Sequence, residues 1–315
     1  MPKLIAAVKS SCDEALRELK QWMRPEKGQN FNDSLSFFSR NCVRASGSCV
    51  VIGAIAAGNA VTALLLELLR ELFLKRLHCL SRSGTRYSTQ VTVRRIIAGK
   101  WQLNNGQACI SVDYIITTKD FAPKLINALR NGIEEFFGAD PFESKYISRI
   151  VSSNHFSRLE RLLDEYKVIH KTKHDLSFYC RKIAPTIFLD VPEDSQLMQE
   201  EIFGPLLPII TVENVKDSID LINSKPKPLV AYLFTDNQKL RNDFVKNVPT
   251  EGMVINDTVL HVTVSNLPFG GVGESGMGSY HGKHSFDAFS HKKAVLYRSF
   301  SGDSPVRYPP YPPRK

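Results

Sequence analysis

The sequence predicts an α/β protein built on a mostly parallel sheet. From Val112 onward, short apolar runs of strand length alternate with longer segments of helical periodicity, which is typical of βαβ architecture. The 315 residues are 43% hydrophobic and 23% charged, within the globular range, so a disordered or collagen-like chain is excluded. The six cysteines form no C-x-x-C pair, which excludes a disulfide scaffold. The length suggests about two domains.

The first third predicts two helical blocks separated by a loop. Residues 12–24 place apolar side chains at helical spacing, with acids first and cations last, and Pro25 stops this helix. Residues 28–48 lose periodicity, whereas residues 63–80 are rich in leucine and predict a second helical block. Residues 81–90 are polar, so we expect an irregular connection there.

The remaining two thirds predict a regular alternation of strands and helices. Gly138 and Asp236 supply a helix end and a helix cap, respectively. Prolines in the last eight residues predict an extended polyproline tail. The expected elements are strands at 112–117, 207–212, 228–234 and 252–256, helices at 120–137, 154–166 and 214–223, a helix capped by Asp236, and the tail at 308–315.

Charge and hydropathy narrow the possible partners. The formal charge is +9, and residues 1–100 carry all of it, with 16 basic and 7 acidic side chains. These cations are scattered and lack interleaved aromatic residues, so we expect no nucleic-acid partner.

Residues 45–66 are uncharged and long enough to cross a bilayer, but glycines and an asparagine interrupt them, which favours two buried helices over a membrane span. The unpaired cysteines and the short apolar run at the N-terminus indicate a cytoplasmic protein.

Cys109 is the candidate nucleophile. It stands in NNGQACIS at 104–111, just before the strand expected at 112. A buried structural cysteine is the alternative interpretation. The small neighbours favour a nucleophile, because they leave the sulfur accessible and the backbone N–H free to face a bound carbonyl group.

Two other segments carry candidate site residues. The EEIFGP segment at 200–205 joins two carboxylates to an aromatic residue and a turn, and a solvated pair beside a core Phe is its alternative interpretation. Residues 271–276 spell the dinucleotide fingerprint, yet Pro268 precedes them and further glycines follow, so we interpret them as a loop. His170 and His174 are four residues apart but surrounded by lysines, and we expect no metal site.

Together and in this order, the segments at 104–111, 200–205 and 267–294 closely resemble the aldehyde dehydrogenase superfamily. The SYHGK…SF…FSHKKA run indicates its class 3 branch, and the sequence looks like the plant members of that branch. The resemblance implies a parallel-sheet catalytic domain of the aldehyde dehydrogenase kind, with a truncated Rossmann-like cofactor domain. We expect a degenerate remnant of the cofactor domain at 1–90, a catalytic thiol domain at 91–280, and a C-terminal arm with a Pro-rich tail at 281–315.

The resemblance also implies roles for site residues. Cys109 matches the thiol that attacks the aldehyde, Glu201 matches the glutamate that holds the nicotinamide ribose hydroxyls, and Phe203 matches the aromatic residue beside the nicotinamide. The implied activity is oxidation of an aldehyde to a carboxylic acid through a cysteine thiohemiacetal and thioester. The implied cofactor is NAD or NADP, and the implied assembly is a homodimer.

Large parts of the family pattern are missing from residues 1–90. The segments that supply the oxyanion asparagine, the turn beside the pyrophosphate and the general-base glutamate are absent. Loss of one oxyanion donor typically costs about 10²- to 10³-fold in rate, so we expect impaired turnover and weakened cofactor binding. Two alternatives stay open: a catalytically silent fragment that pairs with full-length subunits, and a cofactor-independent thiol esterase.

Overall fold

The computed structural model describes most of the chain beyond residue 86 and a few segments before it. The described residues are 12–13, 15–24, 43–44, 61–62, 78–82, 86–164, 168–170, 176–177, 181–264, 266–303 and 307–311. The chain forms two compact units, one of residues Leu65–His281 and one of Met1–Leu64 together with Gly282–Lys315. The three domains expected from the sequence were inferred from the family resemblance and not from compact units, so they stay a prediction.

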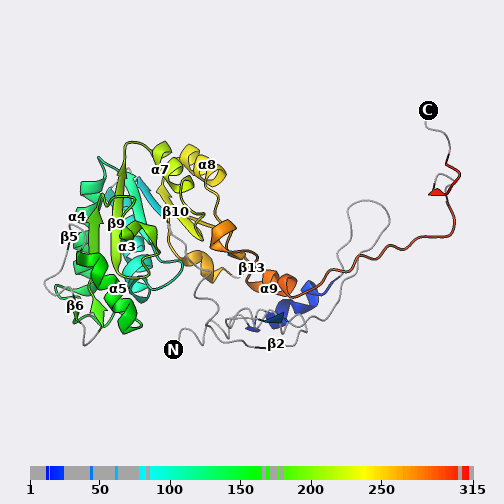
Figure 1. The fold of residues 1–315 in the computed structure, drawn as a ribbon, viewed down its shortest axis with the longest axis horizontal. Helices are drawn as coiled ribbons and strands as arrows, with labels where there is room; N and C mark the ends of the chain where they lie inside the picture. Colours follow the sequence, from blue (N-terminus) through cyan, green and yellow to red (C-terminus); the bar gives the residue numbers. More distant parts are fainter. Residues whose placement is uncertain are drawn as a thin grey trace. The chain divides into compact units, whose positions relative to one another are not determined.

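A seven-stranded sheet forms the centre of the larger unit (Figure 1). Neighbouring strands run parallel throughout, except that the edge strand β5 is antiparallel to β8. The predicted mostly parallel α/β fold is therefore confirmed. In spatial order the strands are β11 (Gly252–Ile255), β10 (Val230–Thr235), β3 (His78–Arg82), β4 (Tyr114–Thr118), β9 (Leu206–Val212), β8 (Thr186–Leu189) and β5 (Val168–His170).

Helices and short strand pairs complete the described structure. The helices are α3 (Arg86–Ile97), the π-helix η2 (Ala98–Gln102), η3 (Asn104–Gly106), α4 (Ala122–Phe137), α5 (Ser153–Asp164), α6 (Gln196–Gln199), α7 (Val215–Asn223), α8 (Gln238–Asn247), η4 (Leu260–Thr263), η5 (Gly273–Ser275) and α9 (Gly282–Ala288). The short strands are β1 (Val43–Arg44) with β2 (Val61–Thr62), β6 (Leu176–Ser177) with β7 (Lys182–Ile183), and β12 (Phe269–Gly270) with β13 (Ser279–Tyr280).

Helices cover both faces of the sheet. Successive strand residues point to opposite faces, so Ile115 of β4 packs in one core cluster and Ile116 in the other. The first cluster holds side chains of α3 and α4, and the second holds side chains of α5, α7 and α8. Each fully buried Ile, Leu or Phe stabilises the fold by about 1.5–3 kcal/mol, and these two clusters contain most of them.

Helix α4 shows how the pattern becomes structure. Leu125, Leu129 and Ile133 follow helical spacing and are at most 1% exposed. Gly138 caps the helix at φ 82°, in the region that favours glycine. The helix predicted at 120–137 is thus confirmed, as are the other predicted helices and strands from residue 112 onward, apart from one cap.

Three local predictions were wrong. Residues 78–80, expected in the leucine-rich helix at 63–80, belong to β3, because pairing with β10 on one side and β4 on the other overrides local helix propensity. Of the stretch at 81–90, expected to be irregular, residues 81–82 belong to β3 and residues 86–90 to α3, and residues 83–85 are not described. The cap of α8 is Asn237 rather than Asp236, and its side chain accepts from the backbone N–H of Leu240 at 3.0 Å.

Several sequence predictions lie partly outside the described residues. In the stretch 45–66, expected to form two helices, residues 61–62 form β2, and the rest is not described. Residues 63–77 are likewise not described. Within the described parts of the chain, helices are too short or too polar to cross a membrane.

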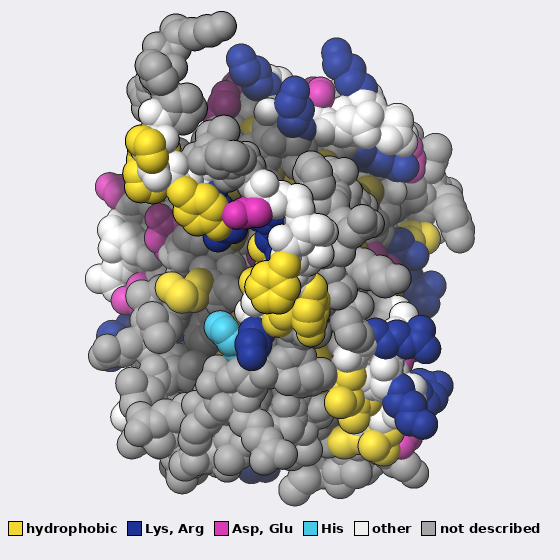
Figure 2. Space-filling view, turned by 90° about the vertical axis from the view of Figure 1, so that its right-hand side faces the viewer, with side chains coloured by type: hydrophobic (Ala, Val, Ile, Leu, Met, Phe, Trp, Pro, Cys, Tyr) yellow, Lys and Arg dark blue, Asp and Glu magenta, His cyan; other side chains and the backbone are white. Residues whose placement is uncertain are grey.

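The smaller unit has its own apolar contact. Residues 12–13 and 15–22 are helical, as predicted, and the Trp22 ring packs 6.0 Å from the Phe286 ring of α9. Figure 2 shows apolar side chains at the surface beside Lys and Arg side chains. In this unit the exposed large apolar side chains include Leu296, Tyr297, Phe300, Tyr308 and Tyr311.

Candidate functional site

Cys109 lies in the loop that leads from η3 into β4, a central strand of the sheet. Its side chain is half-buried rather than enclosed in the core. This exposure favours the nucleophile interpretation over a buried structural cysteine, because a reactive thiol must be reached by its substrate.

The side-chain amides of the NNGQ segment brace this loop. Asn104 Nδ2 donates to the carbonyl oxygen of Gln107 at 3.1 Å, and Gln107 Nε2 donates back to the carbonyl oxygen of Asn104 at 3.0 Å. Gln107 also binds outward, donating to the Arg149 carbonyl oxygen and accepting from the Val151 N–H. These amides therefore fix the backbone that carries Cys109.

Gly106 lets the Cys109 loop touch the EEIFGP segment. Its φ is 82°, and a Cβ at this position would overlap the carbonyl oxygen of Gly204. Trp101 is fully buried, and its Nε1 donates to the carbonyl oxygen of Pro205 at 2.7 Å. Asp113 Oδ1 accepts from the backbone N–H of Ile202 at 3.0 Å. The structure thus brings the two segments that contain Cys109 and Glu201 together.

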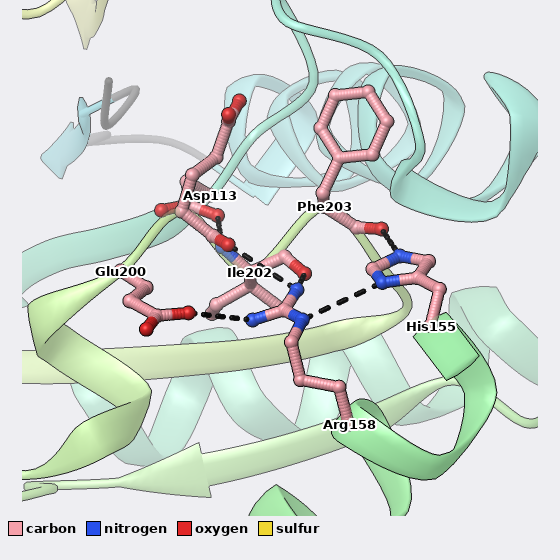
Figure 3. A network of polar contacts seen from close by, with 7 residues as sticks. Asp113, His155, Arg158, Glu200, Ile202 and Phe203 are labelled. Atoms are coloured by element: carbon pink, nitrogen blue, oxygen red, sulfur yellow. Dashed lines mark hydrogen bonds and ion pairs between the residues drawn. The ribbon is translucent and has the colours of Figure 1, made fainter. Parts of the chain in front are cut away.

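Arg158 of α5 binds the EEIFGP segment through hydrogen bonds and an ion pair (Figure 3). Its guanidinium donates to the carbonyl oxygens of Glu201 and Ile202, and it pairs with the Glu200 carboxylate at 3.3 Å. Three contacts from one planar fork fix the backbone orientation around Glu201. Sequence reasoning missed this role, because Arg158 appears there only as a polar position of a predicted helix.

His155, also on α5, holds Phe203. Its Nε2 lies 2.7 Å from the Phe203 carbonyl oxygen, and burial lowers the pKa of the imidazole, so the neutral ring donates from Nε2 (Figure 3). Phe203 adopts φ 51°, which is uncommon for a residue with a side chain. The segment is therefore held in a strained conformation, as is common at functional sites.

Burial and charge set the protonation of the site. Burial, aided by the Asp113 charge, raises the pKa of Glu201 to about 9. Burial and the Glu201 charge also raise the pKa of Cys109, while the backbone N–H groups of Cys109 and Ile110 offset part of this increase. At neutral pH, without ligand, the thiol and the Glu201 carboxyl group therefore both carry protons.

Lys100 adds a third titratable group that sequence reasoning missed. It lies in the π-helix η2, its side chain is fully buried, and desolvation lowers its pKa to about 8. Asp113 and Glu201 are the charges that oppose this decrease. Only the fold shows that the lysine in the run IIAGKW is buried, and that the charges of two carboxyl groups act on its pKa.

The glycine-rich segment forms a loop, in agreement with the sequence interpretation. The fingerprint match at 271–276 follows the two-residue strand β12 and contains the three-residue turn η5 instead of opening a helix. Of the two histidines considered for a metal, His170 lies in β5 and His174 is not described. Within the described ranges, His, Cys, Asp and Glu side chains form no group of three that could hold a metal ion.

Comparisons with known proteins show similarity to one family over much of the chain. Residues 88–295 match the aldehyde dehydrogenase family. "Aldehyde dehydrogenase family 3 member I1, chloroplastic" of Arabidopsis thaliana is 64% identical over 228 residues, which cover 72% of this chain and 42% of the relative. "Aldehyde dehydrogenase, dimeric NADP-preferring" of Rattus norvegicus is 42% identical over 224 residues, which cover 70% of this chain and 49% of the relative. The chain thus spans less than half the length of these curated relatives.

A solved structure extends the similarity to the fold. The substrate-bound AldH of Staphylococcus aureus superimposes with a TM-score of 0.86 at 28% sequence identity, covering 98% of this chain and 84% of that chain.

Proposed function

The chain belongs to the aldehyde dehydrogenase family, and on that premise we propose that it carries the thiol half of an NAD(P)⁺-dependent aldehyde oxidation, with impaired turnover. The observation that carries this proposal is the contact between two segments far apart in sequence. Gly106 packs on Gly204, and Asp113 binds the residue after Glu201, so the half-buried thiol and the carboxyl group share one site.

Cys109 would supply the covalent chemistry. After its proton has passed to solvent, the sulfur attacks the carbonyl carbon of the aldehyde, a C–S bond forms, and the carbonyl electron pair moves to oxygen. The backbone N–H groups of Cys109 and Ile110 lower the pKa of the thiol and so favour the thiolate that attacks. NAD(P)⁺, which Glu201 and Phe203 would hold at its nicotinamide end, would supply the hydride acceptor that this oxidation requires. Loss of the hydride restores the C=O bond and leaves a thioester, and water hydrolyses it: the C–S bond breaks, the acid is released and Cys109 is free again.

The residues present fit the nicotinamide end of the cofactor. Glu201 and Phe203 are both half-buried and adjacent to the Cys109 loop, so a ligand can reach them. A carboxylate that accepts two ribose hydroxyls and an aromatic ring beside the nicotinamide would hold the reacting carbon near the sulfur. The family match begins at residue 88, after the part of the chain that would have to hold the adenosine and pyrophosphate, so we infer weak affinity.

The decisive experiment is an assay of the purified chain with NAD⁺ or NADP⁺ and a panel of aldehydes. Formation of reduced cofactor, followed by absorbance, should be slow and should disappear in Cys109→Ser. Cofactor binding is measured separately by isothermal titration calorimetry. Turnover that survives Cys109→Ser would exclude the proposed nucleophile, and failure to bind either cofactor would exclude the dehydrogenase.

Thiol esterase activity is the second candidate. It is favoured because the Cys109 loop and its bracing contacts lie wholly within the unit Leu65–His281 and need no cofactor. Hydrolysis of p-nitrophenyl acetate by the chain, lost in Cys109→Ser, would support it. A folded chain inactive in both assays would be a silent fragment, and co-purification with a full-length relative would test whether it pairs with such subunits.

Assembly, location and domain boundaries complete the proposal. The rat relative is named dimeric, and we propose a homodimer, to be tested by analytical ultracentrifugation. We also propose a cytoplasmic location, although the Arabidopsis relative is named chloroplastic, so imaging of a fluorescent fusion in plant cells distinguishes the two. The division into residues 1–90, 91–280 and 281–315 is proposed with them.

A further inference from the structure

Cys109 occupies a central position of a tight turn. The backbone N–H of Ser111 donates to the carbonyl oxygen of Ala108 at 2.9 Å, so Cys109 and Ile110 are the two central residues of this turn. Side-chain amides brace the entry to the turn, as described above. The exit lies at Ile110, which is buried, and a buried backbone carbonyl group is costly without a hydrogen-bond donor. The partners of the exit therefore matter for the position of the thiol.

The side chain of Tyr232 supplies one of these partners. Tyr232 lies in β10 and is fully buried, and its hydroxyl group donates to the carbonyl oxygen of Ile110 at 2.7 Å. The same hydroxyl group accepts from the backbone N–H of Val259 at 3.0 Å. It therefore joins the exit of the turn to the segment after β11, donating to one and accepting from the other.

The loop that contains Val259 is itself held in place. Val259 has φ 52°, which is an outlier for a β-branched residue, and Asn256 has φ 62°. The side-chain amide of Asn256 binds both the backbone N–H and the carbonyl oxygen of Thr235, and the hydroxyl group of Thr258 donates to a backbone carbonyl oxygen of α3 at 2.8 Å. Strained backbone persists only where its surroundings hold it, so this loop is a defined support for the Tyr232 hydroxyl group.

Ser111 supplies a second anchor for the exit of the turn. It is 5% exposed, and its Oγ donates to the carbonyl oxygen of Gly99 at 2.9 Å. Gly99 lies in the π-helix η2, a distortion of the backbone that recurs at functional sites. Since the backbone N–H of Ser111 also closes the turn, this one residue joins the turn to η2 through both its main chain and its side chain.

We propose that Tyr232 and Ser111 are positioning residues of the candidate site: their hydroxyl groups hold the exit of the turn at 108–111 and thereby fix the position of the Cys109 thiol. The inference rests on the proposed function only in taking Cys109 as the reactive group. Neither hydroxyl group has to touch the aldehyde or the cofactor, because both act through the backbone of the turn.

The pH midpoint of Cys109 alkylation separates this role from a purely structural one. The backbone N–H groups of Cys109 and Ile110 lower the pKa of the thiol, and a turn without its exit anchor no longer orients them toward the sulfur, so the pKa should rise. Tyr232→Phe keeps the buried ring, and Ser111→Ala keeps the backbone. The Glu201 charge, which also acts on the thiol, is the same in both variants. A hydroxyl group with only a structural role would change thermal stability and leave the midpoint unchanged.

The experiment is alkylation of the full chain by iodoacetamide between pH 7 and 10.5, with each cysteine resolved by peptide mass spectrometry. We expect Tyr232→Phe to raise the Cys109 midpoint by about 0.3–0.7 unit, which is about a two- to fivefold loss in the thiol ionisation constant, and Ser111→Ala to shift it in the same direction. Cys12, a free thiol of the smaller unit, is the internal reference and should not change. The assay needs neither cofactor nor aldehyde, so it stays informative for a chain without dehydrogenase turnover.

Two other hydroxyl deletions are matched controls. Thr250→Val removes a hydroxyl group that donates to the Pro228 carbonyl oxygen at 3.0 Å, and Ser218→Ala removes a fully buried one that donates within α7. Both should leave the Cys109 midpoint unchanged. Each variant is first shown to unfold cooperatively on heating, and if Tyr232→Phe does not fold, Ser111→Ala alone gives the answer. A midpoint that stays constant or falls in either folded variant, or an equal rise in the controls, would overturn the proposal.

Discussion

At the scale of single residues, Gly106 has two independent reasons to be glycine. Its backbone has φ 82°, and the space for a Cβ is taken by the Gly204 carbonyl group. Gly138 has the same φ of 82°, but a Cβ there would meet nothing within 4 Å, so the chain offers a matched comparison. The difference in stability loss between alanine variants at the two positions therefore measures the effect of the close contact between Gly106 and the Gly204 carbonyl group.

We expect Gly138→Ala to lower the free energy of unfolding by about 1–2 kcal/mol, the cost of an unfavourable backbone conformation. Gly106→Ala should cost at least about 2 kcal/mol more, because a backbone carbonyl group must also move. Urea denaturation followed by circular dichroism measures both. Equal losses in the two variants would show that contact with Gly204 does not constrain the loop.

The ionisation of Glu201 predicts a pH-dependent stability. Its pKa is about 9 in the folded chain against an ordinary value of 4.5, so the folded state binds the extra proton. The stabilisation is therefore complete below about pH 4.5 and is lost as the pH rises toward 9. Between pH 6 and 7, below the range in which Lys100 titrates, Glu201 should lower the free energy of unfolding by at most about 1.4 kcal/mol per pH unit.

Urea denaturation at pH 6, 6.5 and 7 checks this slope. In Glu201→Gln the free energy of unfolding should fall less steeply with pH than in the wild-type chain, because the amide does not titrate. Glu200→Gln is the matched control, since Glu200 is the adjacent carboxylate with a side chain 64% exposed, and its slope should equal that of the wild type. The assignment of the raised pKa to Glu201 fails if both variants behave alike.

Single residues also show where the sequence stops being informative. Cys109, Glu201 and Phe203 could be proposed from local patterns, because each stands in a short segment with a recognisable order of residue types. Arg158, His155 and Lys100 could not. Arg158 and His155 contact residues 42 to 48 positions away, and Lys100 is distinguished by its burial alone. Such contacts have no periodicity in the sequence.

At the scale of elements, strong periodicity made α4 predictable, whereas β3 was not. The buried face of α4 follows from its own residues, with Leu125, Leu129 and Ile133 at helical spacing. β3 takes its conformation from its neighbours, because Leu80 pairs with Leu233 of β10 and with Ile116 of β4. A strand defined by two partners rather than by its own alternation carries a weak local signal.

The central position of β3 predicts high sensitivity to proline. Leu80→Pro removes a backbone N–H in a strand paired on both sides, and proline is hardly tolerated in a central strand. We expect this variant to lose its cooperative thermal transition or to accumulate as insoluble protein. Leu80→Val, which retains the N–H and favours strands, should keep the transition. A cooperative transition in Leu80→Pro would show that β3 is not part of the stable sheet.

At the scale of the whole molecule, the boundary of the family match and the boundary of the folded unit differ. The match begins at residue 88, but the larger compact unit begins at Leu65 and includes β3. The strand between β10 and β4 thus lies before the residues that the family match covers. Without it, the edges of β10 and β4 would face each other across an unfilled position, leaving two rows of backbone groups unpaired.

Two truncated chains test this division. Every member of the two large core clusters lies between Val93 and Phe269, so a chain of residues 65–281 should keep a cooperative unfolding transition without the smaller unit. A chain of residues 86–281 contains both clusters and the family-matched residues 88–281, but it lacks β3. We expect it to bind 8-anilinonaphthalene-1-sulfonate and to unfold without cooperativity, because the sheet is then split between β10 and β4. If the shorter chain unfolds as cooperatively as the longer one, the family-matched residues are sufficient, and the preceding residues contribute nothing to the site's support.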